Sequence, residues 1–209
     1  MAFDDRDAPI RLRPDLVEAH RRAWDHVASP GTWWSGGERV QIAAETRLAR
    51  DCALCAQRKA ALSPYGVEGE HASPGRLPGA AIEAAHRLTS DPGRLTKAWV
   101  DSLIADPGAA GDGRITVEQY VELIGVVTQV VSVDECHRAL GLPLEDLPAP
   151  KPGEPSRVRP PGALPEDAWV PMIRPENLDE ANRGLFGPGK RTGNVIRALS
   201  LVPDEVRQL

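Results

Sequence analysis

Proline divides this chain into two parts of different character. The 209 residues include twenty prolines, and a large share of these falls between residues 143 and 165. Proline fixes φ and lacks an amide hydrogen, so such a stretch can neither continue a helix nor form a central strand. We therefore expect one folded domain over 1–145 and a Pro-rich arm over 146–209. Two short helical pieces are expected within the arm, near 175–185 and 192–201.

The apolar residues of the first part predict helices. Only two Phe and two Tyr are present, and the bulk comes from Ala, Leu and Val, a mix that favours helices over a sheet. Thr116 and Gln119 have capping-box spacing, and Gly141 is a good C-terminal stop. The centre of this last helix is β-branched and could be read as a strand, but its length favours a buried helix. The predicted fold class is all-α, with helices near 15–27, 38–51, 52–62, 80–89, 94–105 and 116–140.

Charge and hydropathy exclude several kinds of partner. The formal net charge is −5, with acids and bases interspersed, so neither nucleic acid nor an anionic membrane is expected to bind. No apolar run approaches the ~20 residues that a membrane span needs. Residues 1–7 are charged and lack the apolar stretch of a signal peptide, so we expect a cytoplasmic protein. In that compartment structural thiols stay reduced, and a close Cys pair is more typical of catalysis or metal binding.

Cys52 and Cys55 form a C-x-x-C motif at the start of a predicted helix. Residues three apart on a helix share one face, so the two sulfurs could bridge with little backbone movement. A thiol in the first helical turn also feels the positive end of the helix dipole, which lowers its pKa and favours the reactive thiolate. The motif indicates thiol–disulfide chemistry.

Three other interpretations of the motif stay open. The two residues could be buried structural thiols. A zinc site would need two further ligands, which Cys136 and His137 could supply from another helix. A thioredoxin-like site should follow a strand in an α/β pattern, and the sequence offers no convincing strand.

Five segments resemble, in the same order, those of one known family: 38–45, 51–55, 86–96, 117–124 and 138–142. The chain over about 30–145 is similar to alkylhydroperoxidase D and carboxymuconolactone decarboxylase proteins, in particular to the alkylhydroperoxidase-related branch that includes selenoproteins. The resemblance implies an alkylhydroperoxidase D-like helical bundle that forms homo-oligomers. It also implies an antioxidant enzyme of peroxiredoxin type, which reduces hydroperoxides without a cofactor and is itself restored by an external dithiol or disulfide reductase.

The resemblance also assigns roles, and it leaves the proton relay to be replaced. By resemblance, Cys55 would be the peroxidatic thiol and Cys52 the resolving one. The family's relay places a Glu twelve residues before the first Cys and a His four after the second, where this chain has Val40 and Lys59. Two substitutes are expected. Glu45 lies two helical turns before Cys52, and His71 lies in the loop after the Cys helix, with a pKa suited to a general base.

Alternatives to this function also emerge from the sequence. Without the usual relay, the chain could be a catalytically silent, oligomer-forming domain that kept the fold. Lactone decarboxylation is a weaker alternative, because that branch of the family does not depend on a Cys pair. Residues 197–203 are similar to a segment that introduces a second domain in paired relatives, so 146–209 could also be the start of such a domain.

Overall fold

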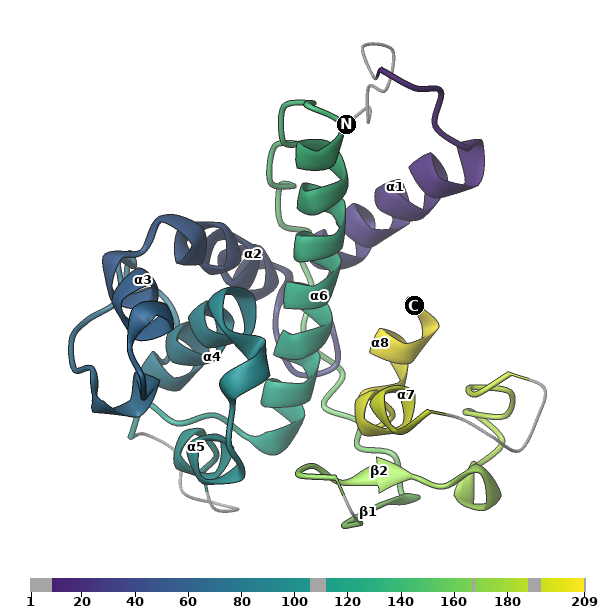
Figure 1. The fold of residues 1–209 in the computed structure, drawn as a ribbon. Helices are drawn as coiled ribbons and strands as arrows, with labels where there is room; N and C mark the ends of the chain where they lie inside the picture. The colour runs from purple at the N-terminus through teal and green to yellow at the C-terminus, as the bar shows by residue number, and fades with distance from the viewer. Residues whose placement is uncertain (1–8, 106–111, 167, 188–192, 209) are drawn as a thin grey trace.

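The protein is mostly helical, as the sequence predicts (Figure 1). The computed structural model describes residues 9–105, 112–166, 168–187 and 193–208. Residues 1–7, from which we expected the absence of a signal peptide, lie outside these ranges. Within them, no helix is both long enough and apolar enough to cross a membrane.

The described residues of the first part form six helices, close to the predicted positions. The Cys helix ends two residues earlier than expected, and the helix predicted over 94–105 begins only after a 3-10 turn, η2 (Pro92–Arg94). The helices are α1 (Pro14–Ala28), α2 (Gly36–Asp51), α3 (Ala53–Ala60), α4 (Gly79–Ser90), α5 (Lys97–Leu103) and α6 (Val117–Ala139).

Helix α6 is the central element of the fold (Figure 1). Its β-branched residues form a helix rather than a strand, and Thr116 and Gln119 form the predicted capping box with both reciprocal hydrogen bonds. Helices α2 and α4 pack against each other and against α6, and α1 crosses both α2 and α6. Their shared core is built from aliphatic side chains and Trp24, Trp34, Trp99 and Tyr120.

The Pro-rich stretch is extended, as expected, but the segment after it is less helical than predicted. β1 (Ala163–Leu164) pairs antiparallel with β2 (Met172–Ile173), a small sheet that the sequence did not predict. The prediction of a helix near 175–185 is wrong, because only the 3-10 turn η3 (Pro175–Asn177) forms there. Asp179 accepts a hydrogen bond from the Asn182 amide, a local bond that competes with the helical ladder. The helix expected near 192–201 is present as α7 (Asn194–Leu199), and α8 (Pro203–Arg207) comes after it.

The C-terminal segment packs into the core of the helices rather than standing apart from it. Ile173, Leu201 and Val202 are almost completely buried and belong to the same apolar cluster as α2, α4 and α6. A buried ion pair adds to this contact, because Arg39 of α2 lies 3.0 Å from Glu205 of α8. Residues far apart in the sequence therefore stabilise one another across this boundary.

Candidate active site

Cys52 and Cys55 lie at the break between α2 and α3. Cys52 is at once the C-terminal cap of α2 and the N-terminal cap of α3, in an extended conformation that ends one helix and starts the next. Cys55 lies in the first turn of α3. Both thiols are free and nearly inaccessible, with exposed fractions of 1% and 2%. The break places both sulfurs on the side of α3 that faces α4.

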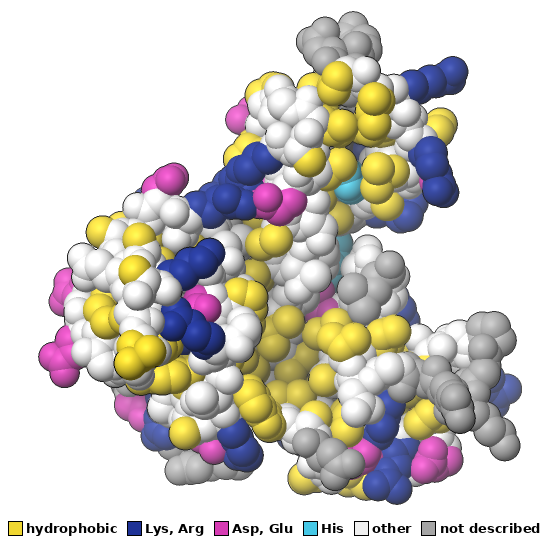
Figure 2. Space-filling view, viewed as in Figure 1, with side chains coloured by type: hydrophobic (Ala, Val, Ile, Leu, Met, Phe, Trp, Pro, Cys, Tyr) yellow, Lys and Arg dark blue, Asp and Glu magenta, His cyan; other side chains and the backbone are white. Residues whose placement is uncertain are grey.

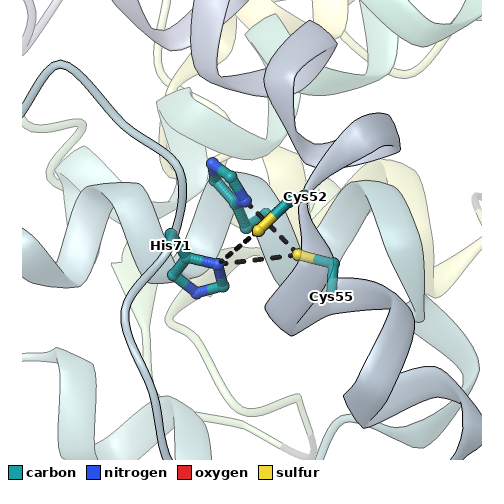
Figure 3. Close-up of side chains that lie close together, drawn as sticks. Cys52, Cys55 and His71 are labelled. Carbon is teal, nitrogen blue, oxygen red and sulfur yellow. Dashed lines mark hydrogen bonds between the residues drawn. The ribbon is translucent and has the colours of Figure 1, made fainter.

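His71 contacts both sulfurs. It lies in the loop between η1 (Pro64–Gly66) and α4, and its Nδ1 is 3.6 Å from Sγ of Cys52 and 3.6 Å from Sγ of Cys55 (Figure 3). One ring nitrogen is therefore shared between the two thiols. A proton held there can pass to either sulfur.

A second imidazole, that of His86, reaches the pair from α4. Its Nδ1 lies 3.3 Å from Sγ of Cys55, and the side chain is completely buried. The two imidazole rings stack at an angle, with centroids 4.1 Å apart. The Cys55 sulfur thus lies within hydrogen-bond distance of both imidazoles, and the Cys52 sulfur within that of His71.

A carboxylate of α4 orients His71 from behind. Oε2 of Glu83 lies 2.7 Å from Nε2 of His71. The carboxylate is itself fixed by Arg58, which donates to it at 2.8 and 3.0 Å, and by the indole N–H of Trp99 at 3.1 Å. With this acceptor at Nε2, the Nε2–H of the ring points at Glu83 and the Nδ1 side faces the thiols.

A carboxylate of α2 does the same for His86. Oε2 of Glu45 lies 3.1 Å from Nε2 of His86, and the hydroxyl of Ser73 donates to Oε1 at 2.6 Å. Glu45 is itself buried, so its remaining partners come from the protein. Two thiols, two imidazoles and two carboxylates therefore form one connected network.

The pKa values of the Cys52 thiol and the His71 imidazole move in opposite directions. Burial works to raise the pKa of Cys52, but hydrogen bonds from the amides of Cys55 and Ala72 and from His71 outweigh it, and the pKa falls to about 7. Burial works to lower the pKa of His71, but its hydrogen bonds to Cys55, Glu83 and Cys52 raise the pKa well above its ordinary value. The pair therefore favours a thiolate at Cys52 beside an imidazolium at His71 near neutral pH.

His86, unlike His71, favours the neutral state. The pKa of His86 is lowered by burial and by the positive charge of His71, although Glu45 acts to raise it. The pKa of Glu83 falls to about 2, because the hydrogen bonds from His71 and Arg58 outweigh its burial. At neutral pH the site thus holds a charged His71 on an ionised Glu83, next to a neutral His86 that can accept a proton.

A small pocket opens beside Cys55. It has a volume of about 260 Å³, and Arg50 and Lys59 give its wall positive charge. Cys52 does not belong to the lining. A larger pocket lies between α1 and the extended segment near residue 150, but it contains none of the cysteines. Of the two thiols in the motif, that of Cys55 is therefore the one next to the small pocket at α3.

All four residues that the sequence suggested for catalysis come together in this cluster. Cys52, Cys55 and His71 touch directly, and Glu45 reaches the thiols only through His86. His86 and Glu83 were not predicted as site residues, since both lie within an amphipathic helix where core packing is the simpler interpretation.

Two further residues, which the sequence suggested as possible metal ligands, lie elsewhere. The Nδ1–H of His137 donates to the Pro143 carbonyl at 2.7 Å, near the C-terminal end of α6. Cys136 is its neighbour on that helix and is partly exposed. Neither joins the group of side chains around the C-x-x-C motif.

Comparisons of the chain with protein-family models, with curated proteins and with solved structures found no match.

Proposed function

We propose that this protein is a thiol-dependent hydroperoxide reductase that cycles between a Cys52–Cys55 dithiol and a disulfide. One observation carries the proposal: two reduced thiols share an imidazole, and each of the two imidazoles nearby is backed by a carboxylate. Such networks let protons move while sulfur changes oxidation state. The sequence resemblance to alkylhydroperoxidase D-like proteins supports the same conclusion. With it we propose that the helices form a bundle of the alkylhydroperoxidase D kind.

In the first step, Cys55 is the thiol that attacks the hydroperoxide. It lines the pocket, and His86 at 3.3 Å is placed to take its proton. The Cys55 thiolate attacks the terminal oxygen, the O–O bond breaks, and the alkoxide leaves with the proton held on His86. The products are an alcohol and a sulfenic acid at Cys55.

In the second step, Cys52 resolves the sulfenic acid. Its lowered pKa of about 7 makes a large fraction of it thiolate at neutral pH, and its sulfur lies within 4.8 Å of that of Cys55. The Cys52 thiolate attacks the sulfur of Cys55, the S–O bond breaks, and the hydroxide leaves as water with the proton of His71. In sum, two thiols and one hydroperoxide give a disulfide, an alcohol and one water.

A reducing partner and self-association complete the proposal. An external dithiol would reduce the disulfide by thiol–disulfide exchange and return the protein to its starting state. Hydrophobic side chains gather in the hollow between the helices and the C-terminal segment on the face drawn in Figure 2. An apolar surface of this kind fits the homo-oligomer that the resemblance implies.

The test uses the stoichiometry of the reaction. The full chain is reduced, freed of metal with a chelator, and mixed with one equivalent of an organic hydroperoxide. We expect the loss of two thiols, a mass decrease of about two protons, and a peptide containing the Cys52–Cys55 disulfide. Cys136→Ser is the matched control and should behave as the wild type.

The two single variants test the order of events. Cys52→Ser should accumulate a sulfenic acid at Cys55 that a dimedone probe traps, whereas Cys55→Ser should not react. Trapping only in Cys55→Ser would reverse the roles of the two thiols. Thiols that stay reduced under one equivalent of hydroperoxide would favour the catalytically silent domain.

A further inference from the structure

The side chains around the C-x-x-C motif also have the composition of a metal site. One ligand atom each from Cys52, Cys55, His71 and His86 lies within 4.8 Å of all the others. Two thiolates and two imidazoles form the Cys₂His₂ set that tetrahedral Zn²⁺ prefers. Magnesium and calcium prefer oxygen ligands, so the set selects against them.

Three sulfur–nitrogen distances in this group fit a tetrahedron. With Zn–S bonds of about 2.3 Å and Zn–N bonds of about 2.0–2.1 Å, neighbouring sulfur and nitrogen ligands are about 3.6 Å apart. His71 Nδ1 lies 3.6 Å from each sulfur, and His86 Nδ1 lies 3.3 Å from Sγ of Cys55. These three sulfur–nitrogen distances match the edges of a zinc tetrahedron, and all four ligand atoms lie within 4.8 Å of one another.

The groups behind the ligands point to the same conclusion. Histidines that bind a metal commonly donate the other ring N–H to a carboxylate, which fixes the ring and makes the ligand more basic. Here Glu83 accepts from Nε2 of His71 at 2.7 Å, and Glu45 accepts from Nε2 of His86 at 3.1 Å. Both rings therefore turn Nδ1 toward the sulfurs, and two independent carboxylate contacts support this orientation.

We propose that the reduced protein binds one Zn²⁺ through Cys52 Sγ, Cys55 Sγ, His71 Nδ1 and His86 Nδ1. The two thiolates balance the charge of the ion. All four ligands come from the protein and are buried or nearly so, which is typical of a closed, structural site. Binding displaces the protons that the thiols and His71 share, so it releases protons. Because this zinc site uses His71 and His86, it differs from the one considered with Cys136 and His137.

The metal would also have a consequence for activity, which rests on the proposed function. A thiolate bound to Zn²⁺ shares its negative charge with the ion and is a weaker nucleophile than a free thiolate, and a disulfide cannot bind the ion. Zinc-bound and disulfide forms therefore exclude each other. The ion would hold the protein in a reduced state that reacts more slowly with hydroperoxide.

Binding is tested without any hydroperoxide. The full chain, reduced with a phosphine and freed of metal, is titrated with Zn²⁺ against a chromophoric chelator, and with Co²⁺ for its absorption spectrum. We expect one equivalent bound, release of protons, and the strong visible bands of tetrahedral cobalt with a thiolate charge-transfer band. His71→Ala and His86→Ala should lose the site, and Glu83→Gln should bind about 10- to 100-fold more weakly. Cys136→Ser, the control, should bind as the wild type does.

An experiment on the wild type guards against variants that misfold. Reduced protein is treated with N-ethylmaleimide with and without one equivalent of Zn²⁺, and each cysteine is mapped by mass spectrometry. Zinc should protect Cys52 and Cys55 and leave Cys136 reactive. Equal labelling in both samples, or zinc binding unchanged in both histidine variants, would overturn the proposal. Since the hydroperoxide assay uses metal-free protein, failure of the zinc site and failure of the reductase can be told apart.

Discussion

Glu45 and His86 form a buried contact that links a carboxylate to the thiol of Cys55. Oε2 of Glu45 lies 3.1 Å from Nε2 of His86, whose Nδ1 lies 3.3 Å from the sulfur. Glu45, which lies two helical turns before Cys52 in the sequence, therefore acts on the Cys55 thiol through the His86 imidazole. The order carboxylate, imidazole and nucleophile is the arrangement that activates a weak nucleophile in many unrelated enzymes.

Glu45→Gln should slow the reaction of Cys55 with hydroperoxide. The substitution removes the negative charge that stabilises a proton on His86, and we expect a loss of about tenfold or more in rate at neutral pH. The rate of thiol loss in reduced, metal-free protein measures this effect. Glu18→Gln, at an exposed site on α1, is the control. Equal rates in both variants would show that Glu45 has a structural role alone.

Cys52 should titrate near pH 7 in reduced, metal-free protein. The thiolate absorbs more strongly in the ultraviolet than the thiol does. A pH titration of this absorbance should therefore show a step at about pH 7 that is missing in Cys52→Ser. Because the pKa is lowered, the thiolate is present above this pH and is lost as the pH falls through it. Disulfide formation should slow accordingly between pH 8 and pH 6.

Loss of the imidazolium at His71 should move the pH at which Cys52 titrates. His71→Gln removes one of the hydrogen bonds that lower the pKa of Cys52, so the step should shift toward higher pH. Cys136→Ser should leave it in place. A step that stays near pH 7 in His71→Gln would mean that the backbone amides alone hold the thiolate.

Glu205→Ala should destabilise the whole fold rather than the C-terminal end alone. Glu205 is buried, and it contacts Arg39, His26 and Gln129. Removal of one partner from a buried ion pair costs about 3–5 kcal/mol. Urea denaturation should show one transition at a lower midpoint, and Asp204→Asn, at an exposed pair with Arg207, should change little. A stability equal to that of the wild type would mean that the segment does not support the core.

The helices of the first part could be predicted because their signals are local. Apolar spacing and caps are read within one segment, and the Thr116 cap correctly favoured a helix where β-branched residues suggested a strand. The break near Asp51 could be anticipated in the same way, and it puts both cysteines at the start of α3. Local helical spacing also placed Glu45 two turns before Cys52.

The remaining parts depend on contacts between distant segments. His86 and Glu83 lie on α4, and they join the site only because α4 packs against α2 and α3. Similarly, no local signal connects Arg39 with Glu205, which lie 166 residues apart. The helix predicted near 175–185 does not form, and the hydrogen bond from the Asn182 amide to Asp179 is one local bond there that competes with helical ones.

The measurement that tests the dithiol reductase most directly is the rate at which reduced, metal-free protein reacts with an organic hydroperoxide, compared with free cysteine at the same pH. General-base assistance and a positioned thiolate predict a reaction at least about 100-fold faster than that of free cysteine. The enhancement should be lost in Cys55→Ser and kept in Cys136→Ser. A wild-type rate equal to that of free cysteine would contradict the account, and the buried pair would then have a structural or metal-binding role.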